Sequence, residues 1–154
     1  SRLKELKYLD ACMKETARQF FTILLVRRAR RATRVGSFTI PAGRLIGVSP
    51  ILLHRDAQIY PQPEVYQPER WLDDARRREL TSRNLFVQFG YGQHRCLGEM
   101  FANTVLKTAW SLLLRDYRLT LLDPDPQPDW TKAVGTPFSK GPLLVRCEPR
   151  HPSA

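Results

Sequence analysis

The sequence contains the stretch Phe89-Gly90-Tyr91-Gly92-Gln93-His94-Arg95-Cys96-Leu97-Gly98-Glu99, in which one cysteine lies between glycines. Gly92 can adopt the positive φ angles of a tight loop, because it has no Cβ atom. An apolar helical pattern starts directly after Cys96, so its thiol is predicted to lie at a helix N-terminus, where unpaired N–H groups stabilise negative charge. Gly98 allows a flat, bulky group to approach the backbone. We therefore expect Cys96 to be a thiolate ligand, a role that cysteine takes towards haem iron.

Phe89, Gly92, Cys96 and Gly98 form the pattern Phe-x-x-Gly-x-x-x-Cys-x-Gly, which resembles the haem-binding loop of the cytochromes P450, the haem-thiolate monooxygenases. His94 stands where that family usually has arginine. The sterol 14α-demethylase branch is similar to this chain at that point, with the run His-Arg-Cys-x-Gly-Glu. The resemblance implies haem b as cofactor and Cys96 as its axial iron ligand. The cofactor-binding residues that it implies are Arg27, Phe89, Gly90, Gly92, His94, Cys96, Leu97, Gly98 and Ala102.

Two of those residues are assigned to the haem propionates by the same resemblance. Arg27 matches an arginine that pairs with a propionate in sterol demethylases, and the planar guanidinium fork can bind both oxygens of a carboxylate. His94 is expected to hold the other propionate, and Phe89 to pack near the sulfur. No catalytic side chain is assigned in this chain, because the cofactor carries out the oxidation.

A helix is predicted over residues 3–21, since apolar side chains recur there at three- and four-residue steps. Glu15 and Arg18 share one face of it, which by itself indicates only an ordinary surface ion pair. The segment is similar to the family's K helix, and Pro68-Glu69-Arg70-Trp71 is similar to its Pro-x-Arg-Phe element, with tryptophan for phenylalanine. The resemblance implies that Glu15, Arg18 and Arg70 form a buried charged triad behind the haem.

Residues 22–26 are apolar and rich in β-branched side chains, so they are predicted to be extended. The resemblance places Leu24, Leu25 and Val26 in the substrate pocket, although an ordinary core strand explains the pattern equally well. Val134, in a turn near residues 134–136, is a fourth pocket candidate.

Strands are predicted at residues 35–40 and 44–49, joined in a hairpin by the turn Pro41-Ala42-Gly43. A short helix is predicted over residues 50–57. His54 in that helix is interpreted as structural, because no carboxylate or cysteine lies at a ligand spacing from it.

Residues 60–85 are rich in proline and charge and show little periodicity, so a long loop is predicted, which the family has as its meander. A helix similar to the family's L helix should follow Cys96, since one apolar stripe continues there. Short strands are predicted near residues 131–134 and 143–147. The fold class is therefore α+β, mainly α, and the resemblance assigns residues 1–154 to the C-terminal part of the cytochrome P450 fold, from the K helix to the C-terminal β hairpins.

The composition limits the other functions of the chain. Its 154 residues include three scattered cysteines, which argues against a disulfide framework or a zinc site and favours a reducing compartment. No apolar run is long enough to span a membrane. The net charge of +10 comes partly from runs of arginine at residues 27–34 and 76–78. A solvated face explains these runs, and no nucleic-acid motif accompanies them, so no nucleic acid is expected as a partner.

The resemblance implies oxidative 14α-demethylation of a sterol or another lipophilic substrate. Reducing equivalents would come from NADPH through an acidic donor, P450 reductase or ferredoxin, on a basic proximal face. The distal oxygen-activating helix is not found in the chain, which is expected to be inactive alone. A eukaryotic full-length protein would lie on the cytosolic side of the endoplasmic reticulum membrane, and otherwise in the cytoplasm. Two alternatives remain open: a non-catalytic, degenerate haem-binding fragment, and a haem-thiolate isomerase. A basic nucleic-acid module is a distant third.

Overall fold

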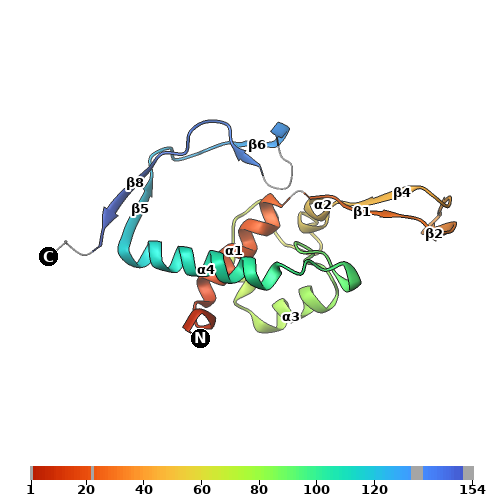
Figure 1. The fold of residues 1–154 in the computed structure, drawn as a ribbon, viewed down its shortest axis with the longest axis horizontal. Helices are drawn as coiled ribbons and strands as arrows, with labels where there is room; N and C mark the ends of the chain where they lie inside the picture. The colour runs from red at the N-terminus through yellow and green to blue at the C-terminus, as the bar shows by residue number, and fades with distance from the viewer. Residues whose placement is uncertain (1, 22, 133–136, 151–154) are drawn as a thin grey trace.

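A computed structural model describes residues 2–21, 23–132 and 137–150, with helices at the centre and β hairpins extending from it (Figure 1). The helical elements are η1 (Arg2–Lys4), α1 (Lys7–Phe20), α2 (Pro50–His54), η2 (Pro68–Trp71), α3 (Asp74–Ser82), η3 (Gly92–His94), α4 (Glu99–Asp116) and η4 (Trp130–Lys132). The strands are β1 (Leu25–Arg28), β2 (Thr33–Val35), β3 (Phe38–Ile40), β4 (Leu45–Val48), β5 (Tyr117–Leu121), β6 (Pro128–Asp129), β7 (Phe138–Ser139) and β8 (Val145–Pro149). The mixture of helices and short antiparallel sheets confirms the predicted α+β class.

Helix α1 contacts α2, η2 and α4, and it also binds the loop that precedes η2. It begins at Lys7 rather than at Leu3, because a turn of 3-10 helix precedes it. Its buried face carries Ala11, Glu15 and Arg18 rather than its apolar stripe. The apolar stripe instead lines a groove of about 800 Å³ whose other wall is α4. The charged face is therefore the one that packs against the rest of the chain.

The core is small and lies where α1, η2 and α3 meet. Ala11, Tyr60, Trp71 and Leu80 are almost completely buried and form one cluster. Phe86 packs against this cluster, with its ring centroid 4.7 Å from that of Trp71. Burying the large aromatic side chains contributes most of the local hydrophobic stabilisation.

The predicted hairpin between residues 35–40 and 44–49 is wrong in its pairing. Strand β4 pairs with β1, and β3 pairs with β2, both antiparallel. A second turn, missed by the prediction, lies at Gly36, whose φ of +58° suits glycine. The predicted turn at Gly43 instead returns the chain to β1, since Gly43 N–H donates to the Ala29 carbonyl at 2.7 Å. The two hairpins together form an arm, residues 25–48, that projects from the helices (Figure 1).

The long loop predicted over residues 60–85 contains a helix, α3, which is a correction to that prediction. Asp73 is its N-cap, and its carboxylate accepts hydrogen bonds from the N–H groups of Ala75 and Arg76. Arg77 pairs with Asp74 at 2.8 Å across one turn. The helix has few apolar residues, and the fully buried Leu80 is its contact with the core, so no apolar period reveals it.

Helix α4 follows the cysteine as predicted, but many of its apolar side chains are exposed, including Met100 at 80% and Phe101 at 75%. No helix among the described residues is long and apolar enough to cross a bilayer. The strand predicted near residues 131–134 is wrong at Thr131 and Lys132, which lie in η4 because Asp129 accepts hydrogen bonds from both the N–H and the hydroxyl of Thr131. Residues 133–136 lie outside the described part. The strand predicted near 143–147 is β8, which begins at Val145 and pairs with β5.

Candidate haem-thiolate site and its supporting cluster

The loop before Cys96 is closed by its own backbone. Cys96 N–H donates to the Phe89 carbonyl at 2.8 Å, which brings the two ends of the loop together. Gly90 and Gly92 have φ angles of +71° and +63°, so both lie in the region that favours glycine. A Cβ atom on Gly90 would come within 3.2 Å of the His94 carbonyl oxygen. The glycines are therefore required by the loop conformation.

The Cys96 side chain is exposed just ahead of α4. Gly98 is the N-cap residue of that helix, and Ala102 N–H donates to its carbonyl at 2.8 Å. A Cβ atom built on Gly98 would lie 3.8 Å from the sulfur, so glycine leaves that side of the sulfur open. Leu97 is completely exposed, at 102%. An accessible thiol among uncovered apolar side chains fits a flat, apolar group that takes one thiolate ligand, as haem does.

Four of the other predicted cofactor and pocket residues lie on the surface: Arg27, His94, Leu24 and Val26. Arg27, in β1, is exposed and donates to the carbonyl of Val26 at 2.7 Å. His94, at the end of η3, is also exposed, and within the described ranges neither side chain takes part in an ion pair. Leu24 and Val26 are 52% and 42% exposed, and Leu25 is half-buried. Val134 lies outside the described residues.

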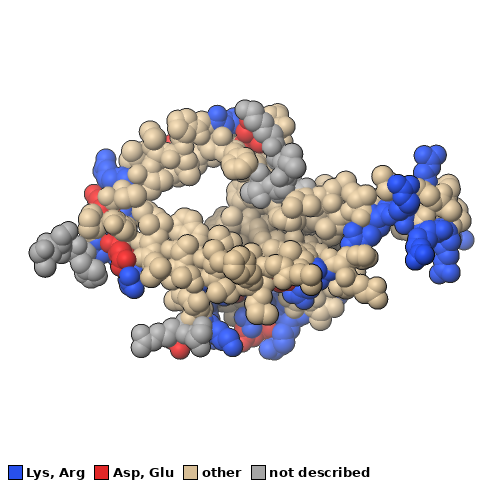
Figure 2. Space-filling view, viewed as in Figure 1, with Lys and Arg blue, Asp and Glu red and all other residues tan. Residues whose placement is uncertain are grey.

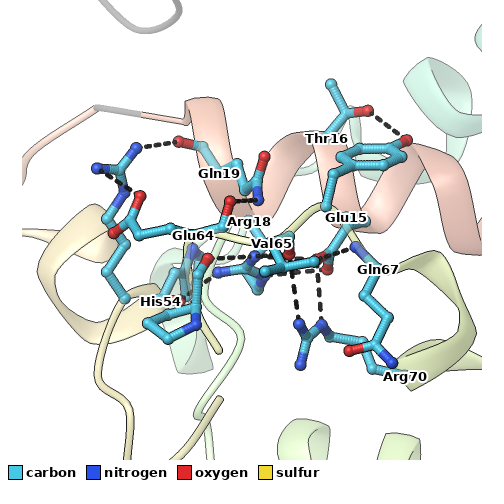
Figure 3. Close-up of polar contacts among 12 residues, drawn as sticks. Glu15, Thr16, Arg18, Gln19, His54, Glu64, Val65, Gln67 and Arg70 are labelled. Carbon is cyan, nitrogen blue, oxygen red and sulfur yellow. Dashed lines mark hydrogen bonds and ion pairs between the residues drawn. The ribbon is translucent and has the colours of Figure 1, made fainter. Parts of the chain in front are cut away.

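Glu15, Arg18 and Arg70 are brought together into one cluster (Figure 3). The Glu15 carboxylate accepts from Arg18 Nε and Nη2 at 3.0 and 2.9 Å, in a bidentate pair. Arg70 Nε donates to Glu15 Oε1 at 3.1 Å. The Glu15 and Arg18 side chains are completely buried, and Arg70 is 9% exposed. Such a buried group is stable only when every charge is hydrogen-bonded.

Both arginines also hold the loop of residues 61–67 against α1. Arg18 donates to the carbonyls of His54 and Pro63, both at 2.7 Å, and Arg70 donates to the carbonyl of Pro61 at 3.2 Å. The backbone N–H of Gln67 donates to Glu15 Oε1 at 3.0 Å. The Glu15 carboxylate and its two arginines together thus connect α1, α2, the loop and η2 (Figure 3).

Trp71 is a further member of the cluster that the sequence analysis did not identify. Its indole Nε1–H donates to Glu15 Oε2 at 2.8 Å, and the side chain is 2% exposed. The sequence did carry a signal for this role, since tryptophan stands where phenylalanine was expected. Unlike phenylalanine, tryptophan has a side-chain N–H group that can donate a hydrogen bond. Trp71 therefore packs in the core and also satisfies the buried charge.

We expect Trp71→Phe to lower the free energy of unfolding by about 1.5–3 kcal/mol, because a hydrogen bond to a buried carboxylate is lost. Urea unfolding followed by circular dichroism measures the change. The matched control is Trp130→Phe, since Trp130 is 41% exposed. Equal effects of the two substitutions would contradict the role of the indole N–H group.

His54 is structural, in agreement with its interpretation from the sequence. It is completely buried, and its Nε2 accepts a hydrogen bond from the N–H of Val87 at 3.1 Å. The neutral ring therefore carries its proton on Nδ1, which has no partner among the described residues. Burial, with a smaller contribution from the nearby Arg18 cation, lowers the pKa of His54 to about 4. His54 is thus held neutral.

The buried cluster makes the fold sensitive to acid. An unfolded histidine has a pKa of about 6.5, so between that pH and about 4 the unfolded chain binds a proton that folded His54 does not. Burial would raise the pKa of Glu15, but hydrogen bonds from Arg18, Gln67 N–H and Trp71 outweigh it and lower that pKa. Stability that Glu15 contributes is therefore also lost as the pH falls through the acid range. His54 and Glu15 therefore both lower the free energy of unfolding as the pH falls.

We expect the free energy of unfolding to fall by about 3 kcal/mol as the pH is lowered from about 6.5 to about 4, from His54 alone. His54→Gln should flatten this part of the profile, since its amide oxygen can still accept from Val87 N–H. Urea titrations at a series of pH values test this. An unchanged slope in His54→Gln would show that another group causes the acid sensitivity.

Comparison with known proteins finds several that are similar to this chain. The family model described as Cytochrome P450 matches residues 1–145. The sterol 14-demethylase of Arabidopsis thaliana is 34% identical over 155 residues, which covers 96% of this chain and 31% of that protein. The human lanosterol 14-alpha demethylase is 37% identical over 138 residues, covering 88% of this chain and 27% of the relative. The chain thus spans less than a third of the length of these relatives.

Proteins that are not named as sterol 14-demethylases are also similar to this chain. The mouse 24-hydroxycholesterol 7-alpha-hydroxylase is 30% identical over 148 residues, which covers 96% of this chain and 31% of that protein. The solved structure of retinoic acid-bound cyanobacterial CYP120A1 superposes with a TM-score of 0.81 at 28% identity, covering 96% of this chain and 34% of that one. The predicted resemblance in sequence and fold is confirmed by these matches.

Proposed function

This chain belongs to the cytochrome P450 family, and from that premise we propose that residues 1–154 are the C-terminal, haem-binding part of a haem-thiolate monooxygenase with Cys96 as axial ligand. The observation that carries the proposal is the exposed Cys96 thiol ahead of α4, with Gly98 leaving one side of the sulfur open. The distal helix that activates oxygen would lie in the part of the relatives that this chain does not span.

The residues of this chain would bind and orient the cofactor. Cys96 would supply the thiolate, and the N–H groups at the start of α4 would stabilise its negative charge. Arg27 and His94, which are exposed and in no ion pair within the described residues, would bind the propionates. Haem with a thiolate ligand supplies an iron centre at which electron density from sulfur favours O–O cleavage. The cluster around Glu15 would act at a distance, by fixing the loop of residues 61–67 on α1.

We assign a 14α-methyl sterol as substrate, with Leu24, Leu25, Val26 and Val134 contacting it. The similarity to two sterol 14-demethylases supports the assignment, as does the run His94-Arg95-Cys96. Electrons would come from NADPH through an acidic partner, P450 reductase or ferredoxin. In a eukaryote the full-length enzyme would act on the cytosolic side of the endoplasmic reticulum membrane.

Turnover by the full-length enzyme tests the function. With a 14α-methyl sterol, product should form only when NADPH and a donor protein are both present. Azoles should bind to the haem iron through a ring nitrogen. The sterol should displace the water molecule that is bound to the iron. Rearrangement of an organic peroxide without NADPH would favour the isomerase instead. If the haem spectrum shifts with fatty acids but not with sterols, the assignment to the family would stand and the assignment of a sterol substrate would be wrong.

A further inference from the structure

Two residues that flank Cys96 carry opposite charges, and neither is among the residues assigned to the haem. Arg95 donates to the Glu99 carboxylate from Nε at 2.5 Å and from Nη2 at 2.8 Å, in a bidentate pair. Arg95 directly precedes Cys96, and Glu99 is the first residue of α4. The two side chains therefore meet across the residue that we propose as the iron ligand.

This ion pair ties the cysteine loop to the helix that follows it. Arg95 has φ −63° and ψ +141°, an extended conformation, so it lies outside α4. An ordinary pair of residues four apart lies along one face of a helix, whereas this pair spans the junction between a loop and a helix. The N–H of Glu99 also donates to the Cys96 carbonyl, at 3.4 Å. Cys96 is thus held from the helix side as well as by its hydrogen bond to Phe89.

Glu99 brings a negative charge to the helix end at which a thiolate would be stabilised. A carboxylate in the first turn of a helix is favourable by itself, because it interacts with the helix dipole. It also repels a thiolate nearby, since like charges that lie close together destabilise each other. The Glu99 side chain is only 25% exposed, so water screens its charge incompletely. The Arg95 cation offsets this repulsion.

Within the described residues, the only ion pair of Glu99 is the one with Arg95. A cavity of about 160 Å³ beside the loop has Lys14, Arg95 and Glu99 as its charged lining residues, and the Lys14 ammonium pairs with Asp10 on α1. Figure 2 shows Lys and Arg gathered mainly at the far end of the arm, residues 25–48, with a largely uncharged surface over α4. That surface therefore supplies few charges that could replace Arg95.

We propose that Arg95 is a positioning residue of the haem site, which neutralises Glu99 beside the Cys96 thiolate and thereby sets the reduction potential of the iron. The inference rests on the proposed function, because it requires Cys96 to be the axial ligand. Groups outside the ligand itself tune a haem through charge and hydrogen bonding. Reduction adds one electron to the iron, so a negative charge nearby opposes it and a positive charge nearby favours it.

Redox titration of the full-length enzyme with dye mediators, without a donor protein, tests the proposal. Each ferric haem takes one electron from the reduced dye and becomes ferrous. At a fixed potential, Glu99→Gln should raise the ratio of ferrous to ferric haem by about three- to tenfold, because a negative charge is removed. Arg95→Gln should lower that ratio by a similar factor, because Glu99 is then unbalanced. A tenfold change corresponds to a shift of about 59 mV in a one-electron couple.

Two further variants separate the charge of the pair from its geometry. Arg95→Lys keeps the positive charge but loses the planar fork, so the ferrous-to-ferric ratio should stay close to that of the parent enzyme. Removing both charges, by combining Arg95→Gln with Glu99→Gln, should also restore the parent ratio. A pair that only held the loop together would give shifts of the same sign in the two single variants, and the double variant would not restore the ratio.

The matched control is a second bidentate pair, at the other end of the same helix. Arg115 donates to the Asp116 carboxylate from Nε at 2.7 Å and from Nη2 at 2.9 Å. The 18-residue helix places Asp116 about 25 Å from Glu99 along its axis. Arg115→Gln and Asp116→Asn should therefore leave the ferrous-to-ferric ratio unchanged.

The proposal is overturned if Arg95→Gln and Glu99→Gln shift the potential in the same direction, or if the control variants shift it equally. Should Arg95→Gln fail to retain haem, Glu99→Gln and Arg95→Lys still decide between the two outcomes. Unchanged potentials in variants that keep the red-shifted Soret band of the reduced carbon monoxide complex would overturn this inference alone. A parent enzyme without that band would overturn both this inference and ligation by Cys96.

Discussion

Glu15→Ala is expected to lower the free energy of unfolding by about 3–5 kcal/mol, which is a large fraction of the about 5–15 kcal/mol that stabilises a domain. The substitution leaves the completely buried Arg18 guanidinium without its carboxylate. The N–H groups of Gln67 and Trp71 lose their acceptor at the same time. In the full-length enzyme the variant should fail to retain haem, rather than retain it with altered substrate choice.

The control for this prediction is Glu64→Ala. Glu64 also pairs with an arginine, Arg55, at 3.4 Å, but its side chain is 71% exposed. Exposed ion pairs contribute about 0–1 kcal/mol, so the control should unfold almost as the parent protein does. Urea unfolding of the two variants measures the difference. A stable, haem-replete Glu15→Ala enzyme would contradict the structural role of the cluster.

The sequence predicted the two longest helices, because an apolar period continues over many residues in each. It also predicted the grouping of Glu15, Arg18 and Arg70, but only through the family resemblance, since a Glu and an Arg three residues apart are ordinary on a helix surface. Outside the charged cluster, Arg18 donates to the backbone carbonyls of His54, Pro63 and Val65, and a backbone carbonyl carries no signal of side-chain type. Periodicity could not have located them.

The differences between the predicted and the observed elements have local causes. Both Gly36 and Gly43 adopt positive φ angles, and the pairing of four short strands depends on which turn each glycine forms. Helix α3 is held by a cap and by charged pairs, so its residues lack the apolar period that identifies a helix. The indole donor of Trp71 was visible as an unusual residue, but its acceptor became apparent only from the fold.

Cys96→Ala is expected to abolish iron ligation by this chain and to release haem from the full-length enzyme. No other side chain of the chain is assigned as a ligand, and the propionate contacts of Arg27 and His94 would remain. Haem content after gel filtration measures the loss. Cys147→Ala is the matched control, because Cys147 is also an exposed, free thiol but lies in β8, after the end of α4. The control should retain its haem in full.

The spectrum of the reduced carbon monoxide complex tests thiolate ligation by Cys96 most directly. In the full-length enzyme and in Cys147→Ala, the Soret band should be red-shifted, because a thiolate donates electron density to the iron. In Cys96→Ala, any haem that remains should lack that band. A red-shifted Soret band that persists unchanged in Cys96→Ala would contradict the account, because another residue would then be the ligand.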